Sequence, residues 1–186
     1  MRPMTPMTRV VDYAVSRQKS ATMDLFLLAT SRCVVGTTSG LTTACLSFGR
    51  PMVLVNCISN DWQLWTDQTD FIVKRLRDRR TGRLLTFGET YRQPIQGYLI
   101  NNVVTHRRGY TIVPNTSEEI REAVAYKLDI LDGTLQRPNS AHPLMAAYGR
   151  DMADNPYMFG AAQPVVPFLA REGSLPAEQR RLQPAA

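Results

Sequence analysis

The chain has few of the residues from which reactive centres are commonly built. Its 186 residues include two histidines, His106 and His142, and three cysteines, Cys33, Cys45 and Cys57. Neither histidine lies near a cysteine or a carboxylate at the spacing of metal ligands, so the sequence predicts no metal site and no Ser–His–Asp triad. The odd number and wide spacing of the cysteines argue against a disulfide framework, and we expect reduced, largely buried thiols.

Long apolar segments are also absent. No apolar run approaches the roughly 20 residues that a helix needs to cross a bilayer. Residues 1–20 contain no apolar core of the kind found in signal peptides. The sequence therefore predicts a cytoplasmic chain without a transmembrane segment.

Three well-known motifs are missing. The sequence contains no GxxxxGK[ST], which excludes a P-loop enzyme, and no GxGxxG dinucleotide fingerprint. The segment Gly36–Gly40, GTTSG, has its serine in the fourth place rather than the third, so it is not the GxSxG nucleophile elbow of a hydrolase.

The composition fits a globular protein, and the positive charge fits either an anionic ligand or a general attraction to nucleic acid, which composition alone does not separate. Hydrophobic residues make up 44% of the chain and the formal net charge is +6. The basic run from Arg75 to Arg83, RLRDRRTGR, has no interleaved aromatic residue for stacking on bases. We interpret this run as a solvated face and predict no nucleic-acid partner.

The segment from Cys33 to Asn56 carries the clearest pattern in the chain. A short apolar strand, Cys33–Val35, leads into a polar turn and then a short helix from about Leu41, which Gly49 ends. The apolar run Met52–Val55 follows as a strand buried on both faces. A strand, a helix and a strand joined by short connections predict a parallel βαβ unit.

The turn between the first strand and the helix is our candidate ligand site. It lies at the carboxyl edge of the predicted sheet, where open α/β folds bind ligands. A helix start offers unpaired N–H groups and a partial positive charge, which together favour a phosphate group. The candidate residues are Thr37, Thr38, Ser39, Gly40 and Leu41. The alternative, that the hydroxyls only cap the helix, is equally compatible with the spacing.

The flanking segments extend this α/β pattern. Val10–Tyr13 is predicted as a strand, and a helix capped by Ser20 is predicted to run to about Thr30. Two consecutive crossovers then precede Asn56, which predicts an α/β fold: a doubly wound, mainly parallel sheet with helices on both faces. Downstream, the capping box Thr116–Glu119 begins a helix that Gly133 ends.

The remaining elements are predicted from weaker patterns. Residues Cys57–Asp70 are predicted as a long loop containing Trp62 and Trp65, which either pack on the domain or serve function. Further strands are predicted at Leu84–Phe87, within Tyr98–Thr105 and at Tyr110–Val113, and helices within Pro138–Gly149 and at Val166–Arg171. We divide the chain into a lead-in (1–9), a nucleotide-binding domain (10–150) and a C-terminal helix with a frayed tail (151–186).

In its order of segments the chain resembles the donor-binding, C-terminal half of bacterial GT-B-type glycosyltransferases. The resemblance covers Val10–Gly133 well and the remainder thinly. The residues that carry it are Asp12-Tyr13-Ala14, Lys19-Ser20, Met23-Asp24, Phe26-Leu27, Gly36-Thr37, Ser39-Gly40-Leu41, Phe48-Gly49, Pro51 and Asn56, followed by Phe71-Ile72, Lys74, Thr81-Gly82-Arg83-Leu84, Asn115-Thr116, Glu118-Glu119-Ile120, Val124 and Phe168-Leu169.

The resemblance implies a Rossmann-like domain that binds a nucleoside-diphosphate sugar, with the diphosphate at Ser39-Gly40-Leu41. It implies surface-polysaccharide or glycan synthesis on a glycan or lipid-linked acceptor, and it leaves open a peripheral position at the inner membrane. No metal and no cofactor besides the sugar donor are implied. Lys19 and Arg17 are the candidate cations for the leaving group, and Asp24 and Asn56 are carried over by pattern.

The chain differs from that family in its extent. A GT-B enzyme has two similar domains with the active site between them, and this sequence has room only for the second. We therefore expect a truncated gene product, one part of a split enzyme with a separate N-terminal half, or a remnant of such an enzyme. In each case the chain is expected to bind the nucleotide or nucleotide-sugar weakly and to transfer no sugar by itself. The alternative is a non-catalytic nucleotide-binding or interaction module derived from such an enzyme.

Overall fold

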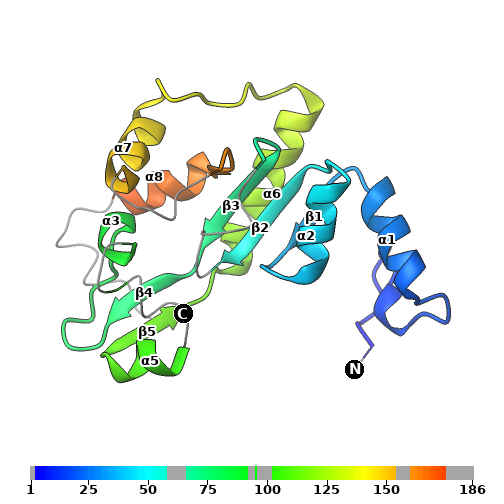
Figure 1. The fold of residues 1–186 in the computed structure, drawn as a ribbon, viewed down its shortest axis with the longest axis horizontal. Helices are drawn as coiled ribbons and strands as arrows, with labels where there is room; N and C mark the ends of the chain where they lie inside the picture. Colours follow the sequence, from blue (N-terminus) through cyan, green and yellow to red (C-terminus); the bar gives the residue numbers. More distant parts are fainter. Residues whose placement is uncertain (1–2, 58–65, 92–94, 96–101, 154–159, 175–186) are drawn as a thin grey trace.

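The structure, a computed structural model, has an α/β arrangement in which helices flank a mainly parallel sheet (Figure 1). It describes residues 3–57, 66–91, 95, 102–153 and 160–174.

Four strands form the main sheet, in the order β1-β2-β3-β6, and all neighbours pair in parallel. Their bounds are β1 Val34–Gly36, β2 Met52–Cys57, β3 Thr69–Val73 and β6 Gln163–Pro164. Helix α2, Gly40–Ser47, connects β1 to β2, so the predicted βαβ unit is confirmed. β2 and β3 are the buried centre of the sheet.

The long helix α6 holds the core together. It spans Ser117–Asp132 and packs on β2, β3 and α8, Val166–Ser174. Thr116 and Glu119 form the predicted capping box, and Gly133, with φ 74°, ends the helix as predicted. Beyond it, α7, Pro143–Met152, packs on α8 and on α3, Phe87–Thr90, through contacts among aromatic rings. The helices predicted within 138–149 and near 166 are therefore confirmed.

A two-stranded antiparallel ribbon extends from β3. β4, Arg75–Asp78, follows β3 after Lys74 alone, and it pairs with β5, Tyr110–Val113, which confirms that predicted strand. Helix α5, Asn102–Arg107, lies beside β5. The basic run identified in the sequence forms β4 and the turn after it, in which the Asp78 carboxylate accepts from the amides of Arg80 and Thr81.

The first predicted strand is wrong. Val10 and Val11 are 49% and 82% exposed, and Tyr13–Val15 form a short 3₁₀ helix, η1. The Tyr13 hydroxyl bonds both the amide and the carbonyl of Ser20, so local contacts fix this segment. Two β-branched residues do not make a strand without a neighbour to pair with. One crossover, not two, therefore precedes the end of β2.

The helix after it is as predicted, but its environment is not. α1 spans Ala21–Thr30, and the Ser20 side chain caps it by accepting from the Met23 amide. No residue of α1 is buried, and Leu25, Phe26 and Leu27 are 45%, 57% and 41% exposed. These apolar side chains therefore meet little of the described protein.

Three more predictions need correction. Residues 69 and 70 of the predicted loop begin β3, because the polar side chain of Asp70 is paired in the core; Trp62 and Trp65 lie outside the described residues. Of Leu84–Phe87, Leu84 forms an isolated bridge and Phe87 begins α3, whose start is fixed by the capping box of Thr86 and Glu89. The described part of the strand predicted within 98–105, residues 102–105, belongs to α5.

Candidate functional site

The start of α2 has its own cap. Ser39 accepts from the Thr42 amide at 3.4 Å, and the Thr42 hydroxyl accepts from the Ser39 amide at 3.0 Å. The same hydroxyl lies 2.7 Å from the Ser39 carbonyl oxygen and 3.2 Å from that of Thr37. The predicted capping by Ser39 is therefore present, and it involves Thr42 as a second cap residue.

The two glycines that flank this turn do different things. A Cβ at Gly36 would lie 2.8 Å from the Thr42 Cγ2 atom, so Gly36 allows the strand to pack closely on the helix. A Cβ at Gly40 would meet nothing within 4 Å, and the Leu41 side chain is 53% exposed. Within the described residues, the amides of Gly40 and Leu41 have no acceptor. The head of the helix is thus open to an external acceptor.

The turn also touches the end of β2. The Thr38 hydroxyl donates to the Cys57 thiol at 3.8 Å. Burial raises the pKa of Cys57 to about 11, while the Thr38 hydrogen bond and the Lys74 ammonium act in the opposite direction. The Lys74 amide donates to the Cys57 carbonyl at 2.7 Å, which places this residue at the same edge of the sheet. The sequence reasoning did not select Lys74 as a site residue, although its place directly after the apolar run of β3 is a signal that could have found it.

The structure does not bring the predicted cations to the turn. Lys19 pairs with Asp24 at 3.7 Å and lies 5.4 Å from the centre of the Tyr13 ring. Arg17 is exposed in the same loop before α1. Among the described contacts, none joins Arg17, Lys19 or Asp24 to Gly36–Leu41. Lys19 and Asp24 thus form a local pair at the start of α1.

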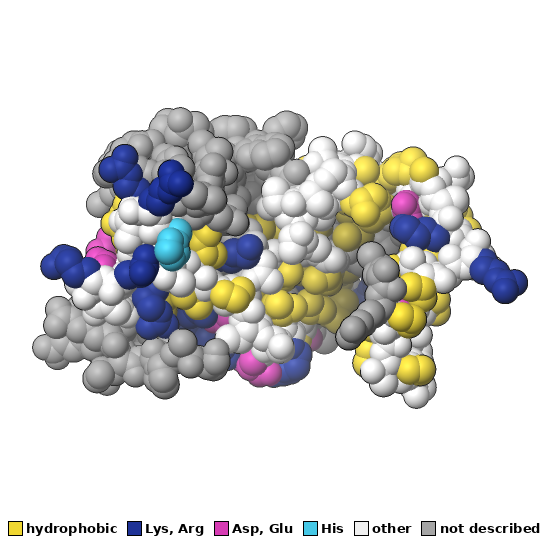
Figure 2. All heavy atoms as spheres, turned by 90° about the horizontal axis from the view of Figure 1, so that it is seen from below, with side chains coloured by type: hydrophobic (Ala, Val, Ile, Leu, Met, Phe, Trp, Pro, Cys, Tyr) yellow, Lys and Arg dark blue, Asp and Glu magenta, His cyan; other side chains and the backbone are white. Residues whose placement is uncertain are grey.

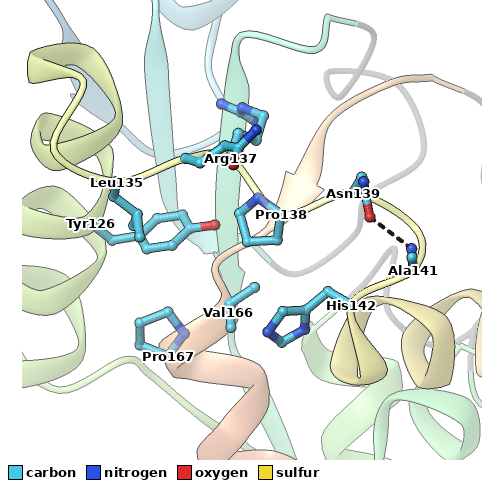
Figure 3. A pocket seen from close by; sticks show the side chains of 10 residues that line it. Tyr126, Leu135, Arg137, Pro138, Asn139, Ala141, His142, Val166 and Pro167 are labelled. Atoms are coloured by element: carbon cyan, nitrogen blue, oxygen red, sulfur yellow. Dashed lines mark hydrogen bonds between the residues drawn. The ribbon is translucent and has the colours of Figure 1, made fainter.

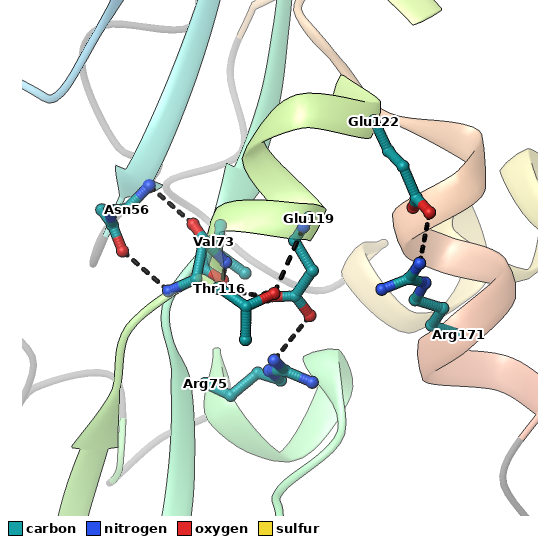
Figure 4. Close-up of polar contacts among 8 residues, drawn as sticks. Asn56, Val73, Arg75, Thr116, Glu119, Glu122 and Arg171 are labelled. Atoms are coloured by element: carbon teal, nitrogen blue, oxygen red, sulfur yellow. Dashed lines mark hydrogen bonds and ion pairs between the residues drawn. The ribbon is translucent and has the colours of Figure 1, made fainter. Parts of the chain in front are cut away.

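Asn56 has a structural partner. Its amide donates to Asn115 Oδ1 at 2.7 Å, and the Asn115 amide donates to Asn56 Oδ1 at 2.8 Å (Figure 4). Asn115 Nδ2 also donates to the Val73 carbonyl at 2.8 Å. Asn56 has φ 53°, a conformation that asparagine tolerates better than most residues. The pair ties the carboxyl ends of β2 and β3 to the start of α6.

The charge at the start of α2 differs from that at two other capped helices. The capping boxes of α3 and α6 use Glu89 and Glu119, each of which pairs with an arginine at 2.6 Å, Arg83 and Arg75 respectively. The corresponding residue in α2 is Thr42, and the first turn of α2 contains no acidic residue. Nothing on α2 itself therefore neutralises the positive end of its dipole.

A second concave surface is strongly basic. Arg79, Arg80, Arg108, Asp78, Gly109 and Tyr110 line a cavity of about 600 Å³. Arg79 also contacts the ring of His106 at 3.3 Å, and Figure 2 shows Lys and Arg side chains gathered around a histidine at this end of the molecule. The fold thus places the aromatic ring of Tyr110 beside the basic run that the sequence predicts as a solvated face.

Comparisons with protein-family models, with curated proteins and with solved structures find no match for this chain. In the part of the chain that the structure describes, no helix has the length and apolar character needed to cross a membrane. The same residues contain no group of three or more His, Cys, Asp or Glu side chains placed to hold a metal ion.

Proposed function

We propose that this chain is the donor-binding half of a bacterial GT-B-type glycosyltransferase, with a Rossmann-like, doubly wound core, and that the start of α2 binds the diphosphate of a nucleoside-diphosphate sugar. The proposal is supported by the place of this helix start, directly after a parallel strand at the carboxyl edge of the sheet.

One observation carries the proposal: the amides of Gly40 and Leu41 are unpaired within the described residues, and no acidic side chain occupies the first turn. An anion placed there gains hydrogen bonds and a favourable dipole without displacing a carboxylate of the protein. The exposed Leu41 and the open space at Gly40 leave room for it.

The same groups suit the chemistry of sugar transfer. Charge that develops on the departing nucleoside diphosphate would be stabilised by the two amides and by the hydroxyl of Thr37. Lys74, near Cys57, replaces Lys19 and Arg17 as the candidate cation. The glycan or lipid-linked acceptor, and the base that activates it, belong in this proposal to a separate N-terminal half.

A second candidate function, a nucleotide-binding or interaction module without transfer activity, is supported by exposed apolar side chains on the edge strand β1 and on α1. Val35 of β1 is 45% exposed, and Phe26 of α1 is 57% exposed. Apolar side chains exposed beside a strand edge are typical of surfaces that another protein covers. Sugar transfer upon addition of an N-terminal half would favour the enzyme; binding of that half without transfer would favour the module.

A thermal-shift panel of nucleoside diphosphates tests the proposal. At least one nucleotide should raise Tm. At a concentration one hundred times its Kd, it should add about 2.7 kcal/mol to the free energy of unfolding. Gly40→Val should abolish the shift and leave the free protein folded, since a Cβ at Gly40 meets no atom within 4 Å. Ser39→Ala should weaken the shift. The proposal fails if no nucleotide raises Tm, or if Gly40→Val responds like the wild type.

A further inference from the structure

A cavity of about 630 Å³ opens between α6, the segment that follows α6, and the starts of α7 and α8. It lies beside β6, the edge of the sheet opposite β1 and the start of α2. It is therefore separate from the nucleotide site proposed above.

The walls of this cavity are mainly apolar, with a few polar side chains among them. Leu135, Pro138, Val166 and Pro167 supply the apolar surface. Figure 3 shows the hydroxyl of Tyr126 and the ring of His142 projecting into the space bounded by Pro138 and Val166. A cavity of this kind binds ligands that have an apolar body and a small polar group.

Three polar side chains of the wall, His142, Tyr126 and Arg137, can donate hydrogen bonds. His142 Nδ1 accepts from the Leu144 amide at 3.3 Å, so the neutral ring carries its proton on Nε2, which can donate to a ligand. Burial, with a contribution from the Asp70 carboxylate, raises the pKa of Tyr126 to about 12, so its hydroxyl keeps its proton. Arg137, which also lines the cavity, has only donors.

The cavity wall also carries an excess of positive charge. Lys127 and Arg137 both pair with one oxygen of Asp70, Oδ2, at 2.7 and 2.8 Å. Asp70 and Lys127 are 0% and 1% exposed, and Arg137, at 23%, reaches the cavity. Among the described residues, no other carboxylate pairs with either cation. Two cations thus share one anion in a poorly solvated environment, which favours a further negative charge nearby.

We propose that this cavity binds a small monocarboxylate with an apolar body. The carboxylate would accept from the Tyr126 hydroxyl and the Nε2–H group of His142, and it would be attracted by the two cations that share Asp70. The apolar body would lie on Leu135, Pro138, Val166 and Pro167. A single excess charge and apolar walls fit such a ligand better than a doubly charged, strongly hydrated phosphate.

The experiment uses benzoate as the probe, with benzamide as its uncharged isostere and inorganic phosphate as the doubly charged anion, in thermal-shift and calorimetric titrations. Benzoate should bind and raise Tm, whereas benzamide and phosphate should bind at least about tenfold more weakly, since one hydrogen-bonded charge contributes about that factor. Equal binding of benzoate and benzamide, tighter binding of phosphate, or no binding of benzoate would overturn the proposal.

Two variants locate the binding without unfolding the protein. His142→Asn keeps a residue that caps helices well but removes the Nε2 donor, and it should weaken benzoate binding about tenfold. Leu135→Ser changes a wall residue that is 37% exposed, and it should weaken binding about fivefold through lost apolar contact. Gly40→Val, at the other edge of the sheet, should bind benzoate like the wild type. Wild-type affinity in both cavity variants would overturn the proposal.

Discussion

Helices α2 and α6 begin at the same edge of the parallel sheet with the same type of cap, yet their charges differ. At α6, Thr116 and Glu119 cap each other, and Glu119 pairs with Arg75 in the interior, 5% and 12% exposed respectively (Figure 4). At α2, Ser39 and Thr42 form the cap, and no charge is involved.

The difference shows that a helix start can have its cap hydrogen bonds and still lack a negative charge to balance the helix dipole. A glutamate in the cap supplies both hydrogen bonds and the negative charge that the helix dipole favours, so the start of α6 needs no ligand. A threonine in the same place supplies hydrogen bonds alone. The start of α2 therefore keeps its attraction for an external anion, and this contrast is the basis of the proposed function.

The largest expected effect comes from removing the charge at α6. Glu119→Gln keeps a side chain that can complete a capping box but removes the carboxylate that pairs with Arg75. Breaking a buried ion pair costs about 3 kcal/mol in the free energy of unfolding, which denaturant titration measures.

Glu118→Gln is the matched control for this variant. Glu118 is in the same helical turn and pairs with Arg121 on the surface, where the two side chains are 53% and 65% exposed. Its loss should change the free energy of unfolding much less than the loss of Glu119, because solvent screens the exposed pair. Equal losses in the two variants would contradict the electrostatic account of α6.

The two glycines at α2 give the next largest effect. Gly36→Ala places a Cβ 2.8 Å from Thr42 Cγ2 and should cost about 2 kcal/mol through overpacking. Gly40→Ala, in open space at the first helical residue, should be neutral or stabilising by up to about 1 kcal/mol. Denaturant titration of the two variants compares them, and the reverse order would show that the turn is not packed as described.

A smaller effect should appear in acid at α3. The Arg83 guanidinium, helped by the Thr86 amide, lowers the pKa of Glu89 to about 2. A lowered pKa means that the carboxylate stabilises the fold above its ordinary pKa, near 4.5, and that this stabilisation is lost as the pH falls toward 2. The effect is small because the Glu89 side chain is 41% exposed.

Glu89→Gln tests this pH dependence. Between pH 5 and 2 the Tm of the wild type should fall more steeply than the Tm of the variant, because the variant has no carboxylate to protonate at this position. Parallel curves for the two proteins would mean that the Arg83–Glu89 pair does not form.

The elements that the sequence predicted well are those with local signals. The βαβ unit around α2 has two apolar runs and a glycine stop, and α6 has a capping box and a terminal glycine. The strand β3 was missed because it begins with Thr69 and Asp70. Asp70 is buried there only because Lys127 and Arg137, 57 and 67 residues away in the chain, pair with it. No local pattern contains that information.

The position of the candidate site could likewise be predicted from the sequence, but the contacts of its residues could not. The spacing of Gly36 and Gly40 located the turn, yet the two glycines look equivalent until packing against Thr42 separates them. Asn56 matched a family pattern, and the structure pairs it with Asn115, 59 residues away. Lys19 also matched that pattern but pairs with Asp24 in the first turn of α1. Such partners depend on the three-dimensional fold.

Calorimetric titration of a nucleoside diphosphate into Leu41→Glu and Leu41→Gln tests the central claim most directly. Leu41 is 53% exposed in the first turn of α2, so either side chain fits. A glutamate there interacts favourably with the helix dipole, by about 0.3–1 kcal/mol, but it repels a bound anion. We predict that Leu41→Glu is at least as stable as Leu41→Gln and binds the nucleotide more than about tenfold more weakly, since a like charge nearby costs more than about 1.4 kcal/mol. Equal affinity in the two variants would contradict an anion site at the start of α2.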